Sequence, residues 1–243
     1  MRLIRERILY SMCYDMLQQE HFAYKTDSGF AIHCRETPLW IMPSRGRESS
    51  EARLFFEDFL RRNNQPIIGI ISEKEIALAC AEAYKKDYFS SELVAYYLAP
   101  EVPLKFASYE LRLASVAEMP LVLEWINNFY TETLDTAFPN EKKGSSEDKP
   151  SFFSQLYVLW DSRPVAMGML SGAGETCRLN LIYVPPPLRG NGYGKAVVSA
   201  LSEKVRENGQ VPMLYTACEN VAANKLYTSL GFREAGRLTE VRF

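Results

Sequence analysis

The sequence predicts an α/β protein of the α+β class, in which a smaller N-terminal α/β domain precedes a larger C-terminal domain. Three observations support this fold class. Apolar runs of strand length alternate with segments of helical period, a stretch with two prolines interrupts them at residues 99–109, and a glycine-rich turn joins a strand to a helix near the C-terminus. The length of 243 residues suits two domains, since most domains have about 100 to 150 residues. We therefore expect domains of residues 1–106 and 107–243.

The composition is that of an ordinary globular protein, with 47% apolar and 24% charged residues. The formal charge of -2, from 28 basic and 30 acidic residues, gives no attraction to a phosphate backbone or an anionic membrane. No segment approaches the roughly 20 apolar residues that span a bilayer, and the N-terminus lacks the pattern of a secretory signal. We expect neither nucleic acid nor a membrane as a partner.

Cysteine usage gives an expectation about compartment and metals. The chain has five cysteines, and they are widely spaced, with no Cys-x-x-Cys pair. This pattern indicates neither a disulfide framework nor a zinc site. We expect reduced thiols, no bound metal and a cytoplasmic protein.

The N-terminal domain is predicted to alternate helices and strands. Apolar residues recur at a spacing of four from Ile4 to Met16, which is a helical period, whereas FAIHCRETPLWIM contains two short apolar runs around a charged turn. The expected elements are a helix over 4–17, a hairpin over 30–42, a helix over 50–63, a strand over 67–71, a helix over 73–86 and a strand over 93–98.

The C-terminal domain is predicted to begin with four strands and one long helix. Ser115 and Glu118 form a capping-box pattern before a helix that continues to about Tyr130. The charged, Ser- and Gly-rich segment 139–150 is expected to be a mobile surface loop. The four strands are expected at YELRLAS (109–115), LYVLWD (156–161), PVAMGMLSG (164–172) and CRLNLIYV (177–184).

A glycine-rich turn follows the fourth of these strands, in the segment VPPPLRGNGYGKAVVSALSEKV at residues 184–205. Such a turn leaves backbone N–H groups unpaired at a helix N-terminus, where the helix dipole favours a phosphate or pyrophosphate. Glycines at positions 190, 192 and 194 remove side chains that would block its approach.

Two other phosphate-binding loops use the same physics and fit less well. A Walker loop requires Ser or Thr after the lysine, and Lys195 is followed by Ala196. A Rossmann loop follows the first strand of its domain and has an acidic residue about 20 positions later. Here the loop follows the fourth strand instead.

A second motif lies downstream, where Asn220-x-x-Ala223-x-x-x-Tyr227-x-x-x-Gly231-Phe232 predicts a short helix. Asn220 is suited to cap this helix and Gly231 to end it. A helix and the strand MLYTAC separate the two motifs.

At these residues the sequence resembles the GNAT superfamily of N-acetyltransferases. The run Arg189-x-x-Gly192-x-Gly194 is similar to their coenzyme A pyrophosphate motif, and the run from Asn220 to Phe232 resembles their second motif. IYVPPPLRGNGYG, MLYTACEN, EVRF and PIIGIISEKEIALACAEAY are also similar to a group of bacterial two-domain predicted acetyltransferases. The N-terminal domain of that group is a degenerate GNAT-like fold.

The resemblance implies a mixed, mostly antiparallel sheet flanked by helices and splayed between its fourth and fifth strands. It also implies acetyl-CoA as cosubstrate. The implied cofactor-binding residues are Ile182, Tyr183 and Val184 along the pantetheine arm, Arg189, Gly190, Asn191, Gly192, Tyr193, Gly194 and Lys195 around the pyrophosphate, and Asn220 and Asn224 at the last helix. Tyr227 matches the tyrosine that protonates the departing thiolate. Plain structural roles stay open: Ile182 to Val184 as a buried strand, Asn220 as a helix cap and Tyr227 as a packed side chain.

The expected activity is transfer of an acetyl group to an amine by direct attack on the thioester. No general base is identified, because Arg178 stands where some family members have a carboxylate, and His21 and His33 lie in the other domain. Cys218 has no nearby histidine in the sequence to activate it as a nucleophile. The alternative is an acyl-CoA binding or sensing module without turnover.

Overall fold

The computed structural model describes residues 2–17, 21–34, 37–44, 48–85, 87–104, 109–137, 155–172 and 174–243. The chain forms two compact units. The first unit comprises Met1–Ala95, Tyr215–Asn220 and Ala235–Phe243, and the second comprises Tyr96–Leu214 and Val221–Glu234. The predicted domain boundary between residues 106 and 107 and the predicted loop at 139–150 both lie outside the described residues. The boundary stays a prediction.

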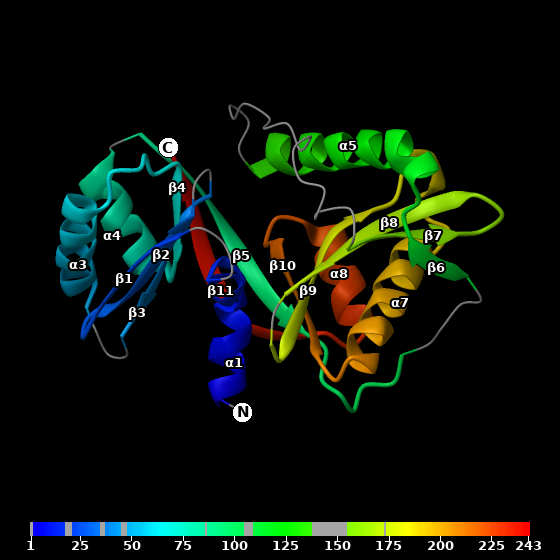
Figure 1. Cartoon of the computed structure of the whole chain (residues 1–243), viewed down its shortest axis with the longest axis horizontal. Coiled ribbons are helices and arrows are strands. Elements are labelled where there is room, and N and C mark those ends of the chain that lie inside the picture. The colour runs from blue at the N-terminus through cyan, green and yellow to red at the C-terminus, as the bar shows by residue number, and fades with distance from the viewer. Residues whose placement is uncertain are drawn as a thin grey trace. The chain divides into compact units, whose positions relative to one another are not determined.

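The first unit contains a sheet in the order β1-β2-β3-β4-β11-β5 (Figure 1). Its strands are β1 (His21–Thr26), β2 (Gly29–Cys34), β3 (Leu39–Pro43), β4 (Gly69–Ser72), most of β5 (Phe89–Tyr97) and most of β11 (Arg233–Arg242). The predicted hairpin is confirmed, since β2 and β3 pair antiparallel. Strand β1 was not predicted. It has mostly exposed or half-buried residues at the sheet edge, so its apolar alternation is weak.

The described residues of the first unit include four helices: α1 (Arg2–Leu9), α2 (Ser11–Met16), α3 (Ser49–Arg62) and α4 (Lys74–Tyr84). The single helix predicted over 4–17 is wrong, because the chain leaves helical geometry at Tyr10, with φ -112° and ψ 25°. Ile8 and Tyr10 are both buried, and on an unbroken helix they would lie about 200° apart. The break lets both side chains face the core.

The second unit contains the sheet order β10-β9-β8-β7-β6. These strands are β6 (Glu110–Leu113), β7 (Leu156–Trp160), β8 (Pro164–Ser171), β9 (Thr176–Tyr183) and the first half of β10 (Val211–Ala217). Pairing is antiparallel from β6 to β9, and β10 runs parallel to β9. The predicted mixed, mostly antiparallel sheet is therefore confirmed, with β9 as the fourth strand of its series.

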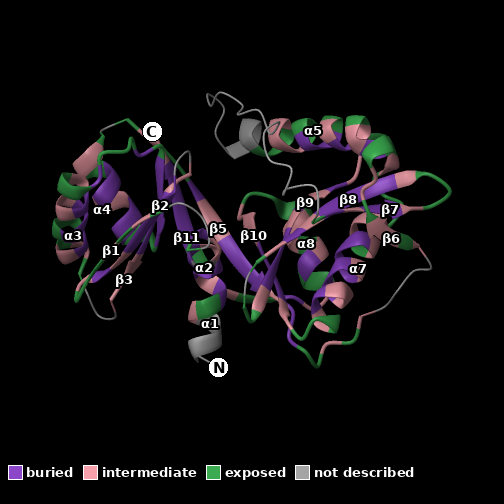
Figure 2. Ribbon diagram, viewed as in Figure 1, coloured by how far each residue is buried: buried purple, intermediate pink, exposed green. Residues whose placement is uncertain are grey.

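Helices cover both faces of this second sheet. They are η1 (Val116–Glu118), α5 (Met119–Ala137), η2 (Pro186–Leu188), α7 (Tyr193–Glu207) and α8 (Val221–Ser229). Figure 1 shows α5 on one side of β7 to β9, with α7 and α8 on the other. Figure 2 shows the buried residues that run along β8 and β9 between them. On the α5 side the core contains Val122, Trp125, Ile126, Met167, Leu181 and Tyr183.

The approach of α7 to the sheet depends on Gly168 of β8. A Cβ at this position would lie 2.5 Å from Leu201 Cδ1 and 2.8 Å from Ile182 Cδ1. Glycine therefore lets the buried face of α7 pack directly on β8 and β9. This packing holds the middle of α7 against the sheet.

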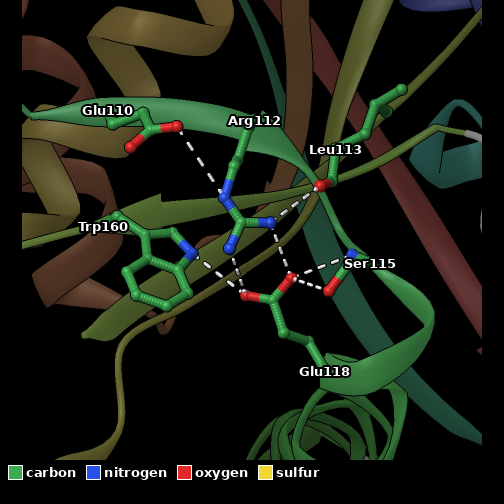
Figure 3. Close-up of polar contacts among 6 residues, drawn as sticks. All are labelled: Glu110, Arg112, Leu113, Ser115, Glu118 and Trp160. Carbon is green, nitrogen blue, oxygen red and sulfur yellow. Dashed lines mark hydrogen bonds and ion pairs between the residues drawn. The ribbon is translucent and has the colours of Figure 1, made fainter.

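The predicted capping box at Ser115 and Glu118 is confirmed (Figure 3). The Glu118 carboxylate accepts hydrogen bonds from the Ser115 N–H and hydroxyl at 2.8 and 2.6 Å and from Trp160 Nε1 at 3.0 Å. The guanidinium of Arg112 donates to both carboxylate oxygens and lies 4.5 Å from the centre of the Trp160 ring. These contacts join β6 and β7 to the start of α5.

Candidate functional site

Strand β9 has an edge that β10 pairs with for only part of its length. The ladder between the two strands joins Val211, Pro212 and Met213 to residues 176–178, and β9 then continues to Tyr183. Among the described strands of the second unit, only β8 pairs with β9 beyond Arg178. The backbone of β9 after this point is therefore the place where an extended ligand could add as a further strand.

A bulge lies in this same stretch of β9. The register with β8 shifts between Met167 and Met169, and Leu181 opposite has φ of 49°, a left-handed conformation that is uncommon for a non-glycine residue. A bulge bends its strand and turns the neighbouring backbone groups away from the ladder. Of the residues predicted along the pantetheine arm, Tyr183 turns its side chain into the α5 core, whereas Ile182 lies toward α7.

The loop after β9 presents a run of backbone donors. The N–H groups of residues 190–195 donate to no acceptor among the described residues, and the first helical bond of this segment is from Ala196 N–H to Gly192 O. Gly190 and Gly192 both have φ of 84°, and a Cβ on either would meet no atom within 4 Å. Their open surroundings and left-handed geometry suit a loop that wraps an anion.

Helix α7 adds favourable electrostatics to this loop. It is 15 residues long, begins after Gly192 and has no acidic residue in its first turn. Its dipole therefore places uncompensated positive potential at the donors. Exposed Lys195 adds a full positive charge in the first turn of the helix. The chemistry of the donors, the dipole and Lys195 fits a phosphate or pyrophosphate.

Gly194 contributes to packing between helices, which its place in the glycine-rich motif did not indicate. A Cβ here would lie 2.9 Å from Leu226 Cδ1 of α8. The absence of a side chain thus lets α7 and α8 approach each other, whereas Gly190 and Gly192 serve the turn itself.

Asn191 and Tyr193 use their side chains to hold the loop in shape. Asn191 Nδ2 donates to the backbone oxygens of Leu188 and Arg189 at 3.1 and 3.4 Å. The Tyr193 hydroxyl donates to Asp161 Oδ2 at 2.7 Å, and its ring makes an edge contact with Tyr109. Both side chains are engaged by protein, which leaves the backbone of the loop as its ligand-facing part.

Arg189 is also tied to the protein. Its backbone N–H donates to Pro186 O at 3.2 Å, so this amide is not among the unpaired donors. Its side chain donates to Val184 O and to Glu132 of α5. Sequence reasoning missed Glu132, because no local pattern joins it to a loop more than fifty residues away.

Asn224 and Tyr227 of α8 both contact Tyr96. Asn224 Oδ1 accepts a hydrogen bond from the Tyr96 hydroxyl at 3.0 Å. The Tyr227 side chain is 8% exposed, with its ring centre 6.2 Å from that of Tyr96 and 5.8 Å from that of Phe232. Burial raises the pKa of Tyr227 far above its ordinary value, so the hydroxyl stays protonated.

Asn220 is exposed and belongs to the first unit, whereas α8 belongs to the second. Its backbone N–H donates to Ala217 O at 3.1 Å. The cofactor roles of Asn220 and Asn224 stay predictions.

Cys218 lacks the setting of a catalytic nucleophile. Its thiol donates to Glu92 Oε2 at 3.1 Å, and burial together with this carboxylate raises the pKa of the thiol to about 11. Reactive cysteines need the opposite shift. Arg178, at the position where a base would be expected, is buried and donates to Asn180 Oδ1 and Ser171 Oγ.

No cluster of histidine, cysteine or acidic side chains suited to a metal ion occurs among the described residues. In the described part of the chain, no helix combines the length and apolar character needed to cross a membrane.

The sequence was compared with known protein families and with curated proteins. Residues 166–242 match the family described as FR47-like protein. No curated protein has a sequence that matches the chain.

Three solved structures have the same fold over nearly the whole chain. A GNAT-family acetyltransferase from Colwellia psychrerythraea is 15% identical, with a TM-score of 0.59, over 99% of this chain and 95% of that one. A GCN5-related N-acetyltransferase from Kribbella flavida is 13% identical, with a TM-score of 0.63, over 98% and 95%. A GCN5-related N-acetyltransferase-like protein from Streptococcus suis is 12% identical, with a TM-score of 0.53, over 99% and 97%. These likenesses show the fold.

Proposed function

We propose that the chain is an N-acetyltransferase. It has the GNAT fold, and residues 166–242 match the FR47-like family. These two findings confirm the resemblance to the GNAT superfamily. The chain would transfer the acetyl group of acetyl-CoA to an amine. The observation that carries this proposal is one continuous segment, residues 176–195. There a bulged strand, which β10 pairs with over only part of its length, leads directly into the loop whose N–H groups have no acceptor among the described residues.

Residues 176–195 would bind two parts of acetyl-CoA, the pyrophosphate and the pantetheine arm. The loop from Gly190 to Lys195 would bind the pyrophosphate through backbone N–H groups and the dipole of α7. The backbone at the end of β9 and just after it, from Ile182 to Val184, would hydrogen-bond the pantetheine arm. The thioester would then lie near the bulge at Leu181, since the arm runs along the strand away from the loop.

The proposed reaction is direct. A neutral amine attacks the thioester carbon, and backbone N–H groups next to Leu181 stabilise the oxyanion that forms. The C–S bond then breaks and the thiolate takes a proton from the Tyr227 hydroxyl. The nitrogen that attacked releases its extra proton to solvent water, and the Tyr227 phenolate regains a proton from water. A free lysine amine has a pKa of about 10.4, so it must lose a proton before attack and the rate should rise with pH.

An acyl-CoA sensor without turnover is the second candidate. The packing of Tyr227, at 8% exposure between Tyr96 and Phe232, favours it, because a closed-in hydroxyl is poorly placed to donate to a ligand. Both candidates require the loop to bind coenzyme A.

Two measurements on the full chain separate the candidates. Calorimetric titration with acetyl-CoA tests binding, and release of free thiol in the presence of a panel of amines tests transfer. An enzyme releases thiol only when a suitable amine is present, whereas a sensor binds and releases none. Absence of binding would reject both candidates.

A further inference from the structure

A three-way contact joins α5, β9 and the glycine-rich loop. Glu132 of α5 accepts a hydrogen bond at Oε1 from the Tyr183 hydroxyl at 3.2 Å and one at Oε2 from Arg189 Nη2 at 2.7 Å. Tyr183 is the last residue of β9, and Arg189 directly precedes Gly190. One carboxylate therefore holds the two ends of the connection between strand and loop.

Arg189 closes this connection into a ring. Its Nε donates to Val184 O at 2.9 Å, and its guanidinium lies 5.6 Å from the centre of the Tyr183 ring. The planar guanidinium reaches Val184 and Glu132 at once because its donors point in fixed, separate directions. Burial and the Glu132 carboxylate raise the pKa of Tyr183, which keeps its hydroxyl a donor.

We propose that Glu132 is a positioning residue that holds Arg189 and thereby keeps the loop from Gly190 to Lys195 in its ligand-binding shape. The inference rests on the proposed function, because it takes this loop as the site for the coenzyme A pyrophosphate. Glu132 touches neither the cosubstrate nor the reacting atoms in this scheme.

The exposure of the Arg189–Glu132 ion pair indicates whether its loss should affect stability or ligand binding. The side chains of Arg189 and Glu132 are 47% and 42% exposed, and exposed ion pairs contribute little to global stability. A ligand that needs an ordered loop, however, binds more weakly when the loop must be ordered during binding. Loss of Glu132 should therefore weaken coenzyme A binding and leave the melting temperature nearly unchanged.

A competing interpretation predicts the opposite sign. If Glu132 merely occupied Arg189 and kept it from the phosphates, removing Glu132 would free the guanidinium and tighten binding. The direction of the change in Kd distinguishes the two interpretations.

The experiment is calorimetric titration of coenzyme A into the full-length protein and four variants. Glu132→Ala is expected to raise Kd about 3- to 10-fold, with a smaller rise for Glu132→Gln, which keeps the hydrogen-bond acceptor and loses the charge. Arg189→Lys should resemble Glu132→Ala, because an ammonium lacks the planar fork by which the guanidinium reaches Val184 and Glu132 at once. The matched control is Glu101→Ala. It removes the acidic partner of Arg233 in another exposed ion pair of the same unit, where the Glu101 side chain is 63% exposed, and should leave Kd unchanged.

The double variant Glu132→Ala, Arg189→Lys tests whether the two residues act together. If Arg189 works through the contact with Glu132, the double variant should bind no more weakly than the weaker-binding single variant. Fully additive losses, or an unchanged or tighter Kd for Glu132→Ala, would overturn the positioning role alone. Failure of the parent protein to bind coenzyme A would overturn the proposed function, and the positioning role with it.

Discussion

The guanidinium of Arg112 donates two parallel hydrogen bonds to the carboxylate of Glu118, from Nη1 to Oε2 at 2.8 Å and from Nη2 to Oε1 at 3.1 Å. Burial of Glu118 opposes ionisation, but the hydrogen bonds from Ser115, Arg112 and Trp160 outweigh it and lower the pKa of Glu118 to about 2. This carboxylate is therefore charged in the folded protein at every ordinary pH.

Glu118 should make stability depend on acid. Its pKa is lower in the folded protein than the ordinary value of about 4.3, so its contribution is complete above that pH and is lost as pH falls toward 2. Glu118→Gln should lower the free energy of unfolding at pH 7 by about 2 kcal/mol and flatten its fall between pH 4.5 and 2. Urea unfolding at pH 7, 4 and 3 measures both effects.

Glu110→Gln is the matched control for this prediction. Glu110 also contacts Arg112, at 3.8 Å, but its side chain is 69% exposed. Its replacement should change the free energy of unfolding by less than about 0.5 kcal/mol. Parallel pH profiles for the parent protein and Glu118→Gln would contradict the role given to Glu118.

Gly192→Asp should abolish coenzyme A binding. Gly192 has φ of 84°, and Asp and Asn are the side chains that best tolerate this region. The two variants Gly192→Asp and Gly192→Asn should therefore have a similar conformational cost at this backbone geometry and differ mainly in charge. The aspartate should repel the pyrophosphate at close range and lose far more affinity than the asparagine in calorimetric titration. Equal Kd values for the two variants would argue against a phosphate at this loop.

Tyr227→Phe should lower kcat about 10²- to 10⁴-fold if the hydroxyl protonates the thiolate. Phenylalanine keeps the ring packed against Tyr96 and Phe232, so the melting temperature and the Kd for acetyl-CoA should change little. Because burial raises the pKa of Tyr227, its ionisation should not limit the rate at mildly alkaline pH. An unchanged kcat, with chemistry shown to be rate-limiting, would assign Tyr227 to packing only.

Cys218→Ser should retain activity. The raised pKa of the thiol, about 11, and its hydrogen bond to Glu92 leave almost no thiolate at neutral pH. Serine keeps a donor for Glu92. Steady-state kinetics of this variant should give kcat within about threefold of the parent, since a positioned nucleophile would cost orders of magnitude. A loss of a hundredfold or more would reopen a covalent mechanism.

The local signals of the sequence predicted much of the second unit. The glycines at 190 and 192 and the apolar period of the next helix indicated a strand, a turn and a helix, and the structure contains these in that order. Anion binding by the turn stays a prediction. Ser115 and Glu118 predicted a capping box for a similar reason, because a few adjacent residues form it.

Features that depend on distant contacts could not be predicted. The role of Glu132 needs α5 to lie beside the end of β9, and the role of Gly194 needs Leu226 of another helix. The break at Tyr10 goes with the burial of both Ile8 and Tyr10, which depends on the tertiary packing. The bulge at Leu181 has no marker in its own residue type.

The course of the chain makes the first unit depend on residues that are encoded after the second. Strand β11 pairs with β4 through Thr239 to Arg242, so the sheet of the first unit needs residues that follow both segments of the second unit in the sequence. N-terminal domains usually fold first during translation, but here the unit that is encoded first can complete its sheet only after the second unit has been synthesised. Truncation of the chain before Thr239 should therefore damage the unit that contains residues 1–95.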